Sequence, residues 1–344
     1  MLIICDIDSG GIFNYAKPLY EKLKNVKKID FYYRTGGFFN RIIYYLNLIR
    51  KLNKTYQFID IQSLSWPMTL LVILIKKLSD SFKLVFESHD DPLTTRTKYR
   101  PMFIRKLILK NSDLIIAHSK YNERIIKNLG FKNVFYIPLG PYVEKPKKIS
   151  QNRAKSIINI NLNKRILLFF GIITPDKGLD VLLRALKIVS EREKNILLLI
   201  VGSVKKEWVR WEDYEKLILN LNIKNFIKTK LEYIGLDKLT PYMYASDIII
   251  MPYREITNSS IPFVTYEFKK PIIATNIGAT KEIVIDNKTG LLVEKENEKE
   301  LAKKILKIIN NKKILKKMGD EGFKLLNTKY SWNTISKKYL FTLR

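Results

Sequence analysis

Histidine and cysteine, which often transfer protons, attack substrates or bind metals near neutral pH, are rare in this sequence. The chain of 344 residues contains 2 histidines and 1 cysteine. A single cysteine excludes an intramolecular disulfide and a zinc site made from several cysteines. His89 follows an apolar stretch in the segment ESHDDP, and its ring titrates near neutral pH. His89 is therefore a candidate functional residue, whereas we expect His118, in a less distinctive position, to be structural.

Glycines and a lysine after apolar stretches indicate sites where a phosphate could bind. Gly10 and Gly11 lie between the first apolar stretch and a helical one, and adjacent glycines let a backbone approach an anion at a helix N-terminus. The pair is not part of a GxGxxG dinucleotide motif, and a plain tight turn explains it equally well. Lys177 lies in a similar loop after Gly171, where its ammonium group could face phosphate or simply be solvated.

Apolar stretches rich in isoleucine, valine and leucine alternate with amphipathic ones, which predicts strands that alternate with helices. The strands expected in the first half are Leu2–Asp6, Ile29–Tyr33, Lys83–Phe86, Leu114–Ala117 and Asn133–Ile137. Those expected in the second half are Ile166–Phe170, Ile196–Val201, Asp247–Met251, Pro271–Ala274 and Gly290–Val293. Strands that are apolar throughout are typical of a parallel sheet covered by helices on both faces.

The alternation stops and restarts around residues 138–163, a segment that contains three prolines and a glycine. We therefore predict an α/β protein with two doubly wound, Rossmann-like domains, residues 1–150 and 151–330. Ligands of such sheets bind at the carboxyl ends of the strands, so two domains facing each other would form a binding cleft there.

The order and spacing of several motifs resemble those of a known family. In the second half they are FGIITPDKGLD at 170–180, IVGS at 200–203, YASDIIIMP at 244–252, Glu267, PIIAT at 271–275, GATKEIV at 278–284 and DNKTGLLV at 286–293. In the first half they are Gly10-Gly11, His89-Asp90, SDLII at 112–116 with Ser119, and IPLG at 137–140. The series resembles glycosyltransferase family 4, among the glycosyl transferases group 1, which has the GT-B fold.

The resemblance implies a retaining, hexosyltransferase-type enzyme that moves a sugar from a nucleotide diphosphate sugar to a glycan or lipid-linked acceptor. It implies no cofactor, because the nucleotide sugar is a co-substrate, and no obligatory metal. The donor would bind to residues 151–330 and the acceptor to residues 1–150. A last helix, residues 331–344, would pack back on the first domain.

The resemblance also assigns roles to particular residues. Lys177 would hold the diphosphate, Glu267 the ribose hydroxyls, and His89 would lie beside the transferred sugar; we take these three as the catalytic candidates. A carboxylate suits a vicinal diol because it accepts two hydrogen bonds. The glycines expected to line the donor site are Gly10, Gly11, Gly171 and Gly202.

The sequence departs from the family pattern at two positions. Ile172 stands where the family usually has an arginine, and Ser259 stands where it has the first of two glutamates. Arg254 is a candidate replacement for the arginine, and Asn258, Ser259 and Ser260 are candidate donors to phosphate or sugar. The departures motivate an alternative function: a weakened or inactive GT-B protein that binds a sugar nucleotide, a glycan or a membrane.

No metal site is expected. Asp6-Ile7-Asp8 has the letters of the DxD motif that metal-dependent glycosyltransferases use. Here the segment joins the first strand to the glycine loop, which is a different context. Two histidines and one cysteine offer little other metal-ligand chemistry.

The large positive charge predicts attraction to a polyanion. Lysine and arginine number 62 against 33 acidic residues, a net charge of +29. Basic and aromatic residues combine in Phe31–Lys54 and Arg96–Lys110, a pattern of interfacial membrane helices as well as of ordinary amphipathic helices. No nucleic-acid-binding motif is present, so nucleic acid is only the third alternative. The first residues lack signal-peptide features, and we expect a cytoplasmic protein that associates with the anionic inner face of the membrane.

Overall fold

The computed structural model divides the chain into two compact units. The first comprises Met1–Gly140 and Tyr330–Arg344, and the second Pro141–Lys329. The structure describes all residues except 6–9, 25–27, 34–45, 50, 53–55, 64, 80, 90–101 and 143–145. The division after Gly140 comes earlier than the predicted boundary between residues 150 and 151.

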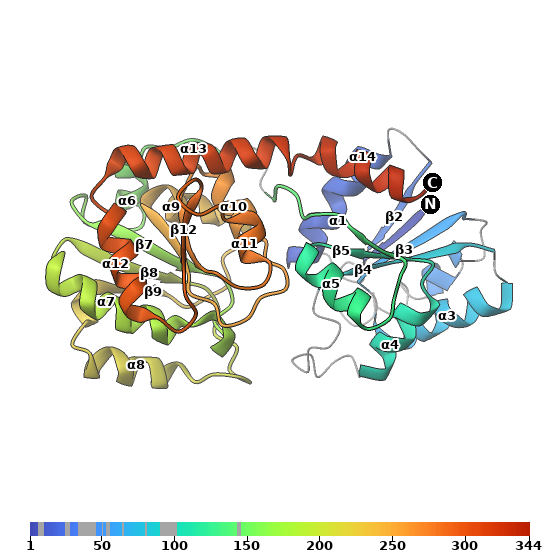
Figure 1. The fold of residues 1–344 in the computed structure, drawn as a ribbon, viewed down its shortest axis with the longest axis horizontal. Coiled ribbons are helices and arrows are strands. Elements are labelled where there is room, and N and C mark those ends of the chain that lie inside the picture. The colour runs from blue at the N-terminus through green and yellow to red at the C-terminus, as the bar shows by residue number, and fades with distance from the viewer. Residues whose placement is uncertain are drawn as a thin grey trace. The chain divides into compact units, whose positions relative to one another are not determined.

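The first unit is built on a parallel sheet of six strands in the order β2-β1-β3-β4-β5-β6, with helices on both faces (Figure 1). The strands are β1 (Leu2–Cys5), β2 (Asp30–Tyr33), β3 (Phe58–Ser63), β4 (Lys83–Ser88), β5 (Leu114–Ala117) and β6 (Val134–Tyr136). Its helices include α1 (Gly10–Leu23), α3 (Trp66–Ser79), α4 (Met102–Asn111), α5 (Lys120–Asn128) and α14 (Trp332–Thr342).

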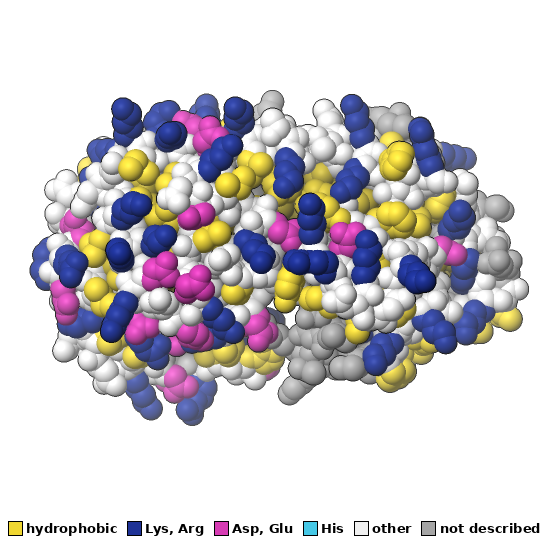
Figure 2. Space-filling model, in the orientation of Figure 1, with side chains coloured by type: hydrophobic (Ala, Val, Ile, Leu, Met, Phe, Trp, Pro, Cys, Tyr) yellow, Lys and Arg dark blue, Asp and Glu magenta, His cyan; other side chains and the backbone are white. Residues whose placement is uncertain are grey.

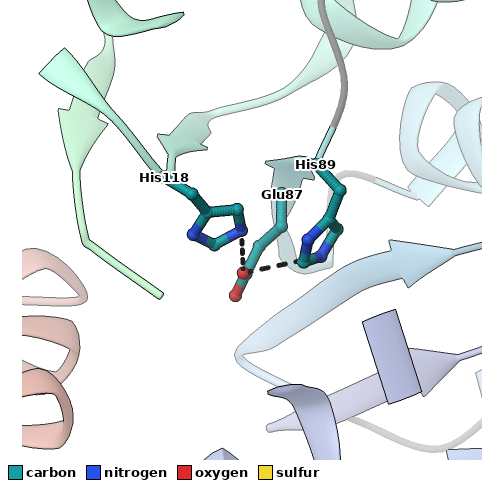
Figure 3. A group of neighbouring side chains, drawn as sticks. All are labelled: Glu87, His89 and His118. Atoms are coloured by element: carbon teal, nitrogen blue, oxygen red, sulfur yellow. Dashed lines mark ion pairs between the residues drawn. The ribbon is translucent and has the colours of Figure 1, made fainter. Parts of the chain in front are cut away.

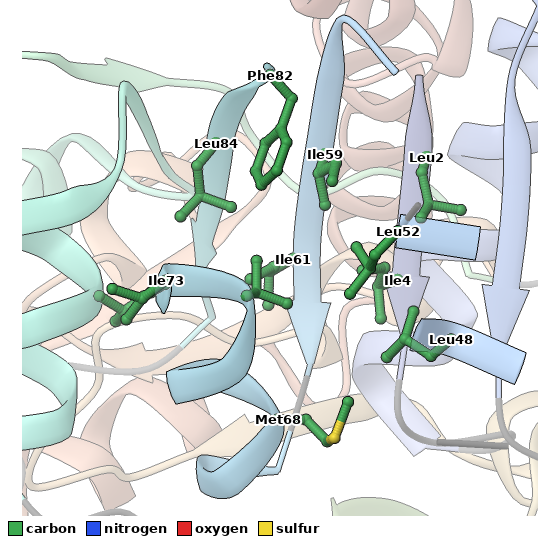
Figure 4. Close-up of a cluster of buried hydrophobic side chains, with 12 residues drawn as sticks. Leu2, Ile4, Leu48, Leu52, Ile59, Ile61, Met68, Ile73, Phe82 and Leu84 are labelled. Carbon is green, nitrogen blue, oxygen red and sulfur yellow. The ribbon is translucent and has the colours of Figure 1, made fainter. Parts of the chain in front are cut away.

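Alternate residues of neighbouring strands form the core on one face of this sheet. Leu2 and Ile4 of β1 lie beside Ile59 and Ile61 of β3, because side chains two apart in a strand point to the same face. Met68 of α3 is among the helical residues that cover them (Figure 4). This packing holds the strands in register and so fixes the loops that follow their carboxyl ends.

The last helix completes the first unit. The Trp332 ring of α14 lies 5.5 Å from the Tyr15 ring of α1, measured between centroids. Gly140 lies against the same helix, since a side chain there would come within 2.9 Å of Ile335. Residues from both ends of the chain therefore build the first unit.

The second unit has a parallel sheet of six strands in the order β12-β11-β10-β7-β8-β9. The strands are β7 (Arg165–Phe170), β8 (Ile196–Val201), β9 (Ile227–Lys230), β10 (Ile248–Met251), β11 (Ile272–Thr275) and β12 (Gly290–Val293). The helices are α6 (Gln151–Ile157), α7 (Leu179–Arg192), α8 (Trp211–Asn220), α9 (Leu236–Ala245), α10 (Ile261–Glu267), α11 (Thr280–Ile283), α12 (Glu298–Ile308) and α13 (Lys312–Thr328).

The predicted fold class, two doubly wound α/β units, is confirmed. Every residue of β8 is buried, as expected for a parallel strand covered on both faces. None of the helices that the structure describes is long and apolar enough to cross a membrane.

Candidate functional site

Two predicted glycines lie side by side at the carboxyl edge of the second sheet. Gly171 follows β7 and Gly202 follows the neighbouring strand β8. Gly202 has a φ of +148°, and a side chain there would overlap the carbonyl oxygen of Gly171. A side chain at Gly171 would come within 3.1 Å of Ile261, the first residue of α10. Glycine at both positions therefore lets two strand ends and a helix N-terminus approach closely.

Lys177 lies at the same edge and contacts a buried aromatic ring. It ends the 3-10 helix η1 (Pro175–Lys177), which leads through Gly178 into α7. Its Nζ atom lies 4.1 Å from the centre of the Tyr253 ring, in the loop after β10, and 3.8 Å from Asp176 Oδ2. The face of an aromatic ring attracts a cation, so Tyr253 keeps the ammonium group beside the strand ends.

Gly178 explains how the Lys177 loop meets the loop after β10. Its φ is +64°, and a side chain there would overlap the carbonyl oxygen of Pro252. The backbone N–H of Arg254 donates to the backbone carbonyl of Asp176 at 2.7 Å. The two loops thus pack backbone against backbone, which fixes the position of Lys177.

Arg254 fastens these loops through its side chain. The guanidinium donates to both oxygens of Asp180 at 2.7 and 2.8 Å, to both oxygens of Glu296, and to the Pro175 carbonyl at 2.8 Å. With its donors used in this way, Arg254 supports the Lys177 loop. Its candidacy for direct contact with phosphate stays a prediction.

The charge of Asp180 reflects this arrangement. Burial by itself raises the pKa of Asp180, but hydrogen bonds from Arg254 and Arg184 outweigh it and bring the pKa down to about 2. The pKa of Arg254 is raised, chiefly by its hydrogen bonds to Asp180. The pair is therefore ionised throughout the physiological pH range.

The segment after β10 carries the remaining donor-site candidates. Ser259 Oγ accepts the Ile261 N–H at 3.2 Å, and Ser260 directly precedes α10. Asn258 lies just before these serines. Glu267 ends α10 and is 8% exposed. The second unit thus gathers Gly171, Gly202, Lys177 and the two serines at one edge of its sheet.

The first-unit candidates lie after β1 and β4. Gly10 and Gly11 are the first residues of α1, whereas Asp6 and Asp8 of the DxD letters lie outside the described residues. His89 directly follows β4. Its Nε2 atom lies 3.0 Å from Oε1 of Gln62.

Behind His89 lies a cluster of buried polar side chains that sequence reasoning missed. Glu87 lies between the rings of His89 and His118 (Figure 3). Its Oε2 is 3.0 Å from His118 Nε2 and 3.9 Å from His89 Nε2. Asp60, nearby in β3, is fully buried. The sequence does contain an indication of this cluster, because polar residues interrupt the otherwise apolar segments FIDIQS and KLVFES.

Glu87, His89 and His118 are of the residue types that bind metal ions, and their ligand atoms lie within 4.8 Å of one another. Ligands about 2.1 Å from one tetrahedral zinc ion would be roughly 3.5 Å apart. The group is wider than that, and His89 Nε2 already faces Gln62. Our expectation that the protein needs no metal stays a prediction.

A family model described as "Glycosyl transferases group 1" matches residues 150–325. The chain belongs to this family. The matched segment contains the glycines, Lys177 and both serines at the edge of the second sheet.

Curated relatives agree with the family. The chain is 32% identical over 254 residues to an uncharacterized glycosyltransferase of Methanocaldococcus jannaschii, covering 70% of this chain and 62% of that protein. It is 27% identical over 231 residues to a capsular polysaccharide biosynthesis glycosyltransferase of Staphylococcus aureus, covering 65% and 58%. The chain thus spans less than two thirds of the length of these relatives.

Solved structures share the whole fold. Sucrose-phosphate synthase from Thermosynechococcus elongatus has a TM-score of 0.79 at 17% identity, covering 99% of this chain and 97% of that one. HepE of Anabaena, in complex with UDP and glucose, has a TM-score of 0.78 at 16% identity, covering 100% and 99%. The fold is GT-B, as the sequence motifs predicted.

Proposed function

We propose that the protein is a retaining glycosyltransferase that moves a sugar from a nucleotide diphosphate sugar to a glycan or lipid-linked acceptor, without an obligatory metal. The observation that carries the proposal is the Lys177 site: an ammonium group held over the Tyr253 ring beside two glycines with positive φ at neighbouring strand ends. Membership of the family supplies the reaction class. The solved complexes of Anabaena HepE contain UDP or UDP-glucose, which supports a nucleotide donor here.

The donor diphosphate would meet Lys177 and the open backbone at Gly171 and Gly202. Without a metal, the protein must stabilise the charge that develops on the leaving diphosphate, and a fixed ammonium group does this. Ser259 and Ser260 would donate further hydrogen bonds. Glu267 would accept hydrogen bonds from the ribose hydroxyls.

The transfer would occur on one face of the sugar. The bond from the anomeric carbon to the phosphate oxygen breaks as the bond to the acceptor oxygen forms, and the leaving phosphate takes the acceptor proton. This scheme needs no covalent nucleophile from the protein. His89 would orient the sugar or the acceptor hydroxyl.

Release of nucleoside diphosphate from a panel of nucleotide sugars, each with candidate acceptors, tests the proposal. We expect turnover with at least one donor, and a loss of about 100-fold or more in kcat/KM for Lys177→Ala. Lys216→Ala, which changes an exposed lysine on α8, is the matched control and should retain full activity. Equal activity of Lys177→Ala and the control would contradict the role of Lys177.

The alternative function, binding without transfer, is favoured by Ile172. This apolar side chain is 45% exposed at the position of the usual arginine. Calorimetric binding of a nucleotide sugar that is never turned over with any acceptor would favour this alternative.

Contact with an anionic membrane surface remains part of the proposal. Much of the two basic, aromatic stretches lies outside the described residues. In α4, Ile104 and Ile108 are buried, whereas Phe103 is 64% exposed. In the view of Figure 2, the lysine and arginine side chains of the described residues are scattered over the surface of each unit, and within neither unit do they line up in a single stripe of the kind that tracks a nucleic-acid strand.

A further inference from the structure

The polar cluster in the first unit joins the loop after β4 to the last helix. Its members are almost fully buried: Asp60 and Tyr339 are 0% exposed, Glu87 1%, Gln62 2% and His118 3%. They come from β3, β4, the end of β5 and α14. Buried polar groups are costly unless they are hydrogen-bonded, so each contact among them restricts where the hydrogens lie.

One chain of contacts runs from α14 to His89. The Tyr339 hydroxyl donates to Asp60 Oδ2 at 2.6 Å, and the Gln62 amide nitrogen donates to the same oxygen at 2.7 Å. The Gln62 amide oxygen is therefore the atom that faces His89 Nε2 at 3.0 Å. Because an amide oxygen only accepts, Nε2 must carry a hydrogen.

The neighbouring imidazole, His118, carries its hydrogen on the other ring nitrogen. His118 Nδ1 lies 2.9 Å from the carbonyl oxygen of Ile137, so Nδ1 carries the hydrogen. In the neutral ring, Nε2 then has only its lone pair, and it faces Glu87 Oε2 at 3.0 Å. The two rings lie 4.4 Å apart between centroids.

The contact between Glu87 and His118 requires a shared hydrogen. A carboxylate oxygen and a bare ring nitrogen are both acceptors and would repel each other at this distance. Among the described residues, His118 Nε2 has no other hydrogen-bond partner. The Glu87 carboxyl also interacts with the side chains of Gln62, Asp60, Tyr339 and Tyr15, which lower its pKa against the effect of burial. Burial raises the pKa of Glu87 and lowers the pKa of His118, so at neutral pH the hydrogen resides on Glu87. Glu87 then places no full negative charge beside His89.

We propose that Tyr339, Asp60 and Gln62 are positioning residues that fix His89 in the tautomer with its hydrogen on Nε2. Nδ1 is then the nitrogen that can accept a hydrogen bond or a proton. The consequence for catalysis rests on the proposed function, in which His89 lies beside the transferred sugar. The assignment of the tautomer rests on the contacts alone.

The test uses the fact that the chain has only 2 histidines. Protein labelled with ¹⁵N-histidine gives two imidazole spin systems, whose nitrogen shifts distinguish a ring N–H from a bare nitrogen. We expect opposite tautomers at pH 7: hydrogen on Nε2 in His89 and on Nδ1 in His118. Hydrogen on Nδ1 of His89, or a rapidly exchanging mixture, would overturn the proposal. A shift of His118 Nε2 on addition of one equivalent of Zn²⁺ would overturn the shared hydrogen.

Two variants test the positioning residues separately. Gln62→Met keeps the approximate volume but removes the acceptor, and Tyr339→Phe removes only the hydroxyl. We expect His89 to become a tautomer mixture in Gln62→Met and to shift in the same direction, but less, in Tyr339→Phe. His118 serves as the internal reference for folding in both. An unchanged His89 spectrum in both variants would overturn the proposal.

Kinetics separate failure of this proposal from failure of the proposed function. We expect Gln62→Met to lower kcat about tenfold, the size of one lost hydrogen bond in the transition state, with the donor KM within about twofold. Full activity alongside a changed His89 tautomer would refute the catalytic consequence. A protein inactive with every donor would refute the proposed function, while the tautomers would still be measured.

Discussion

Arg254 has two candidate roles, support of the Lys177 loop and direct contact with phosphate, and its replacement by methionine tests which of them holds. Both Arg254 and Arg184 donate to Asp180, but Arg254 is 26% exposed and Arg184 45%. Arg184 is paired along one helix at i, i+4. Arg184→Met is therefore a matched control that breaks a surface contact to the same carboxylate.

The size of the effect follows from the pKa of Asp180. A fall from 3.8 to about 2 corresponds to about 2 kcal/mol, at about 1.4 kcal/mol per unit. Partial exposure and the share of Arg184 reduce this figure. We expect Arg254→Met to lower the free energy of unfolding by about 1–2 kcal/mol at pH 7, and Arg184→Met by about 0.5 kcal/mol or less.

The pH dependence gives a second measure. Because the pKa of Asp180 is lower in the folded protein, its contribution to stability is present above about pH 4 and is lost as the pH falls toward 2. Urea denaturation of wild type and Arg254→Met, followed by circular dichroism, should show a smaller difference at pH 3 than at pH 7. A difference that is equal at the two pH values would contradict the ion pair.

Binding decides between the two roles. If Arg254 supports the Lys177 loop, Asp180→Asn should weaken nucleoside diphosphate binding in the same direction as Arg254→Met. If Arg254 contacts phosphate, only Arg254→Met should weaken binding. Wild-type stability of Arg254→Met, together with an affinity loss of about tenfold that Asp180→Asn does not reproduce, would refute the supporting role.

Two further predictions concern stability in denaturation experiments. Gly202→Ala should lower the free energy of unfolding by about 3 kcal/mol or more, because the new side chain overlaps the Gly171 carbonyl. The control Gly130→Ala, with φ +93° and open space around it, should lower it by only about 1 kcal/mol through backbone strain. Similar losses in the two variants would contradict the close approach of the two strand ends. Burial lowers the pKa of Lys270 to about 8, so the folded protein releases this proton at a lower pH than the unfolded chain does. The free energy of unfolding of the wild type should therefore rise between pH 8 and 10 relative to that of Lys270→Met. Parallel pH profiles of the two proteins would contradict a buried, titrating Lys270.

Strands were predictable where burial demands an unbroken apolar stretch. β7 and β8 are apolar on both faces, and the sequence marks them clearly. We did not predict β3, because Asp60 and Gln62 interrupt its apolar letters, or β9, whose sequence IKTK carries two lysines. Both segments are strands because they pair with neighbouring strands in the sheet, and a local sequence pattern does not show that pairing.

In the candidate site too, the features that follow from the order of elements were predictable, and those that depend on long-range contacts were not. Gly171 and Gly202 follow strands directly, and Lys177 lies between β7 and α7, so their position at the sheet edge could be predicted from the order of elements. The partners of Arg254 could not, because Asp180 is 74 residues away in the sequence. Tyr339 and Asp60 are 279 residues apart, and their hydrogen bond exists only once the tertiary structure forms.

The membership of α14 in the first unit has a consequence for how the protein is made. Residues 1–140 and 330–344 form that unit, and the whole second unit is synthesised between them. A nascent chain can fold residues 141–329 while the first unit still lacks its last helix. Until then, Asp60 lacks the Tyr339 hydroxyl that binds it in the finished protein. The first unit, although translated first, is therefore the last to be completed.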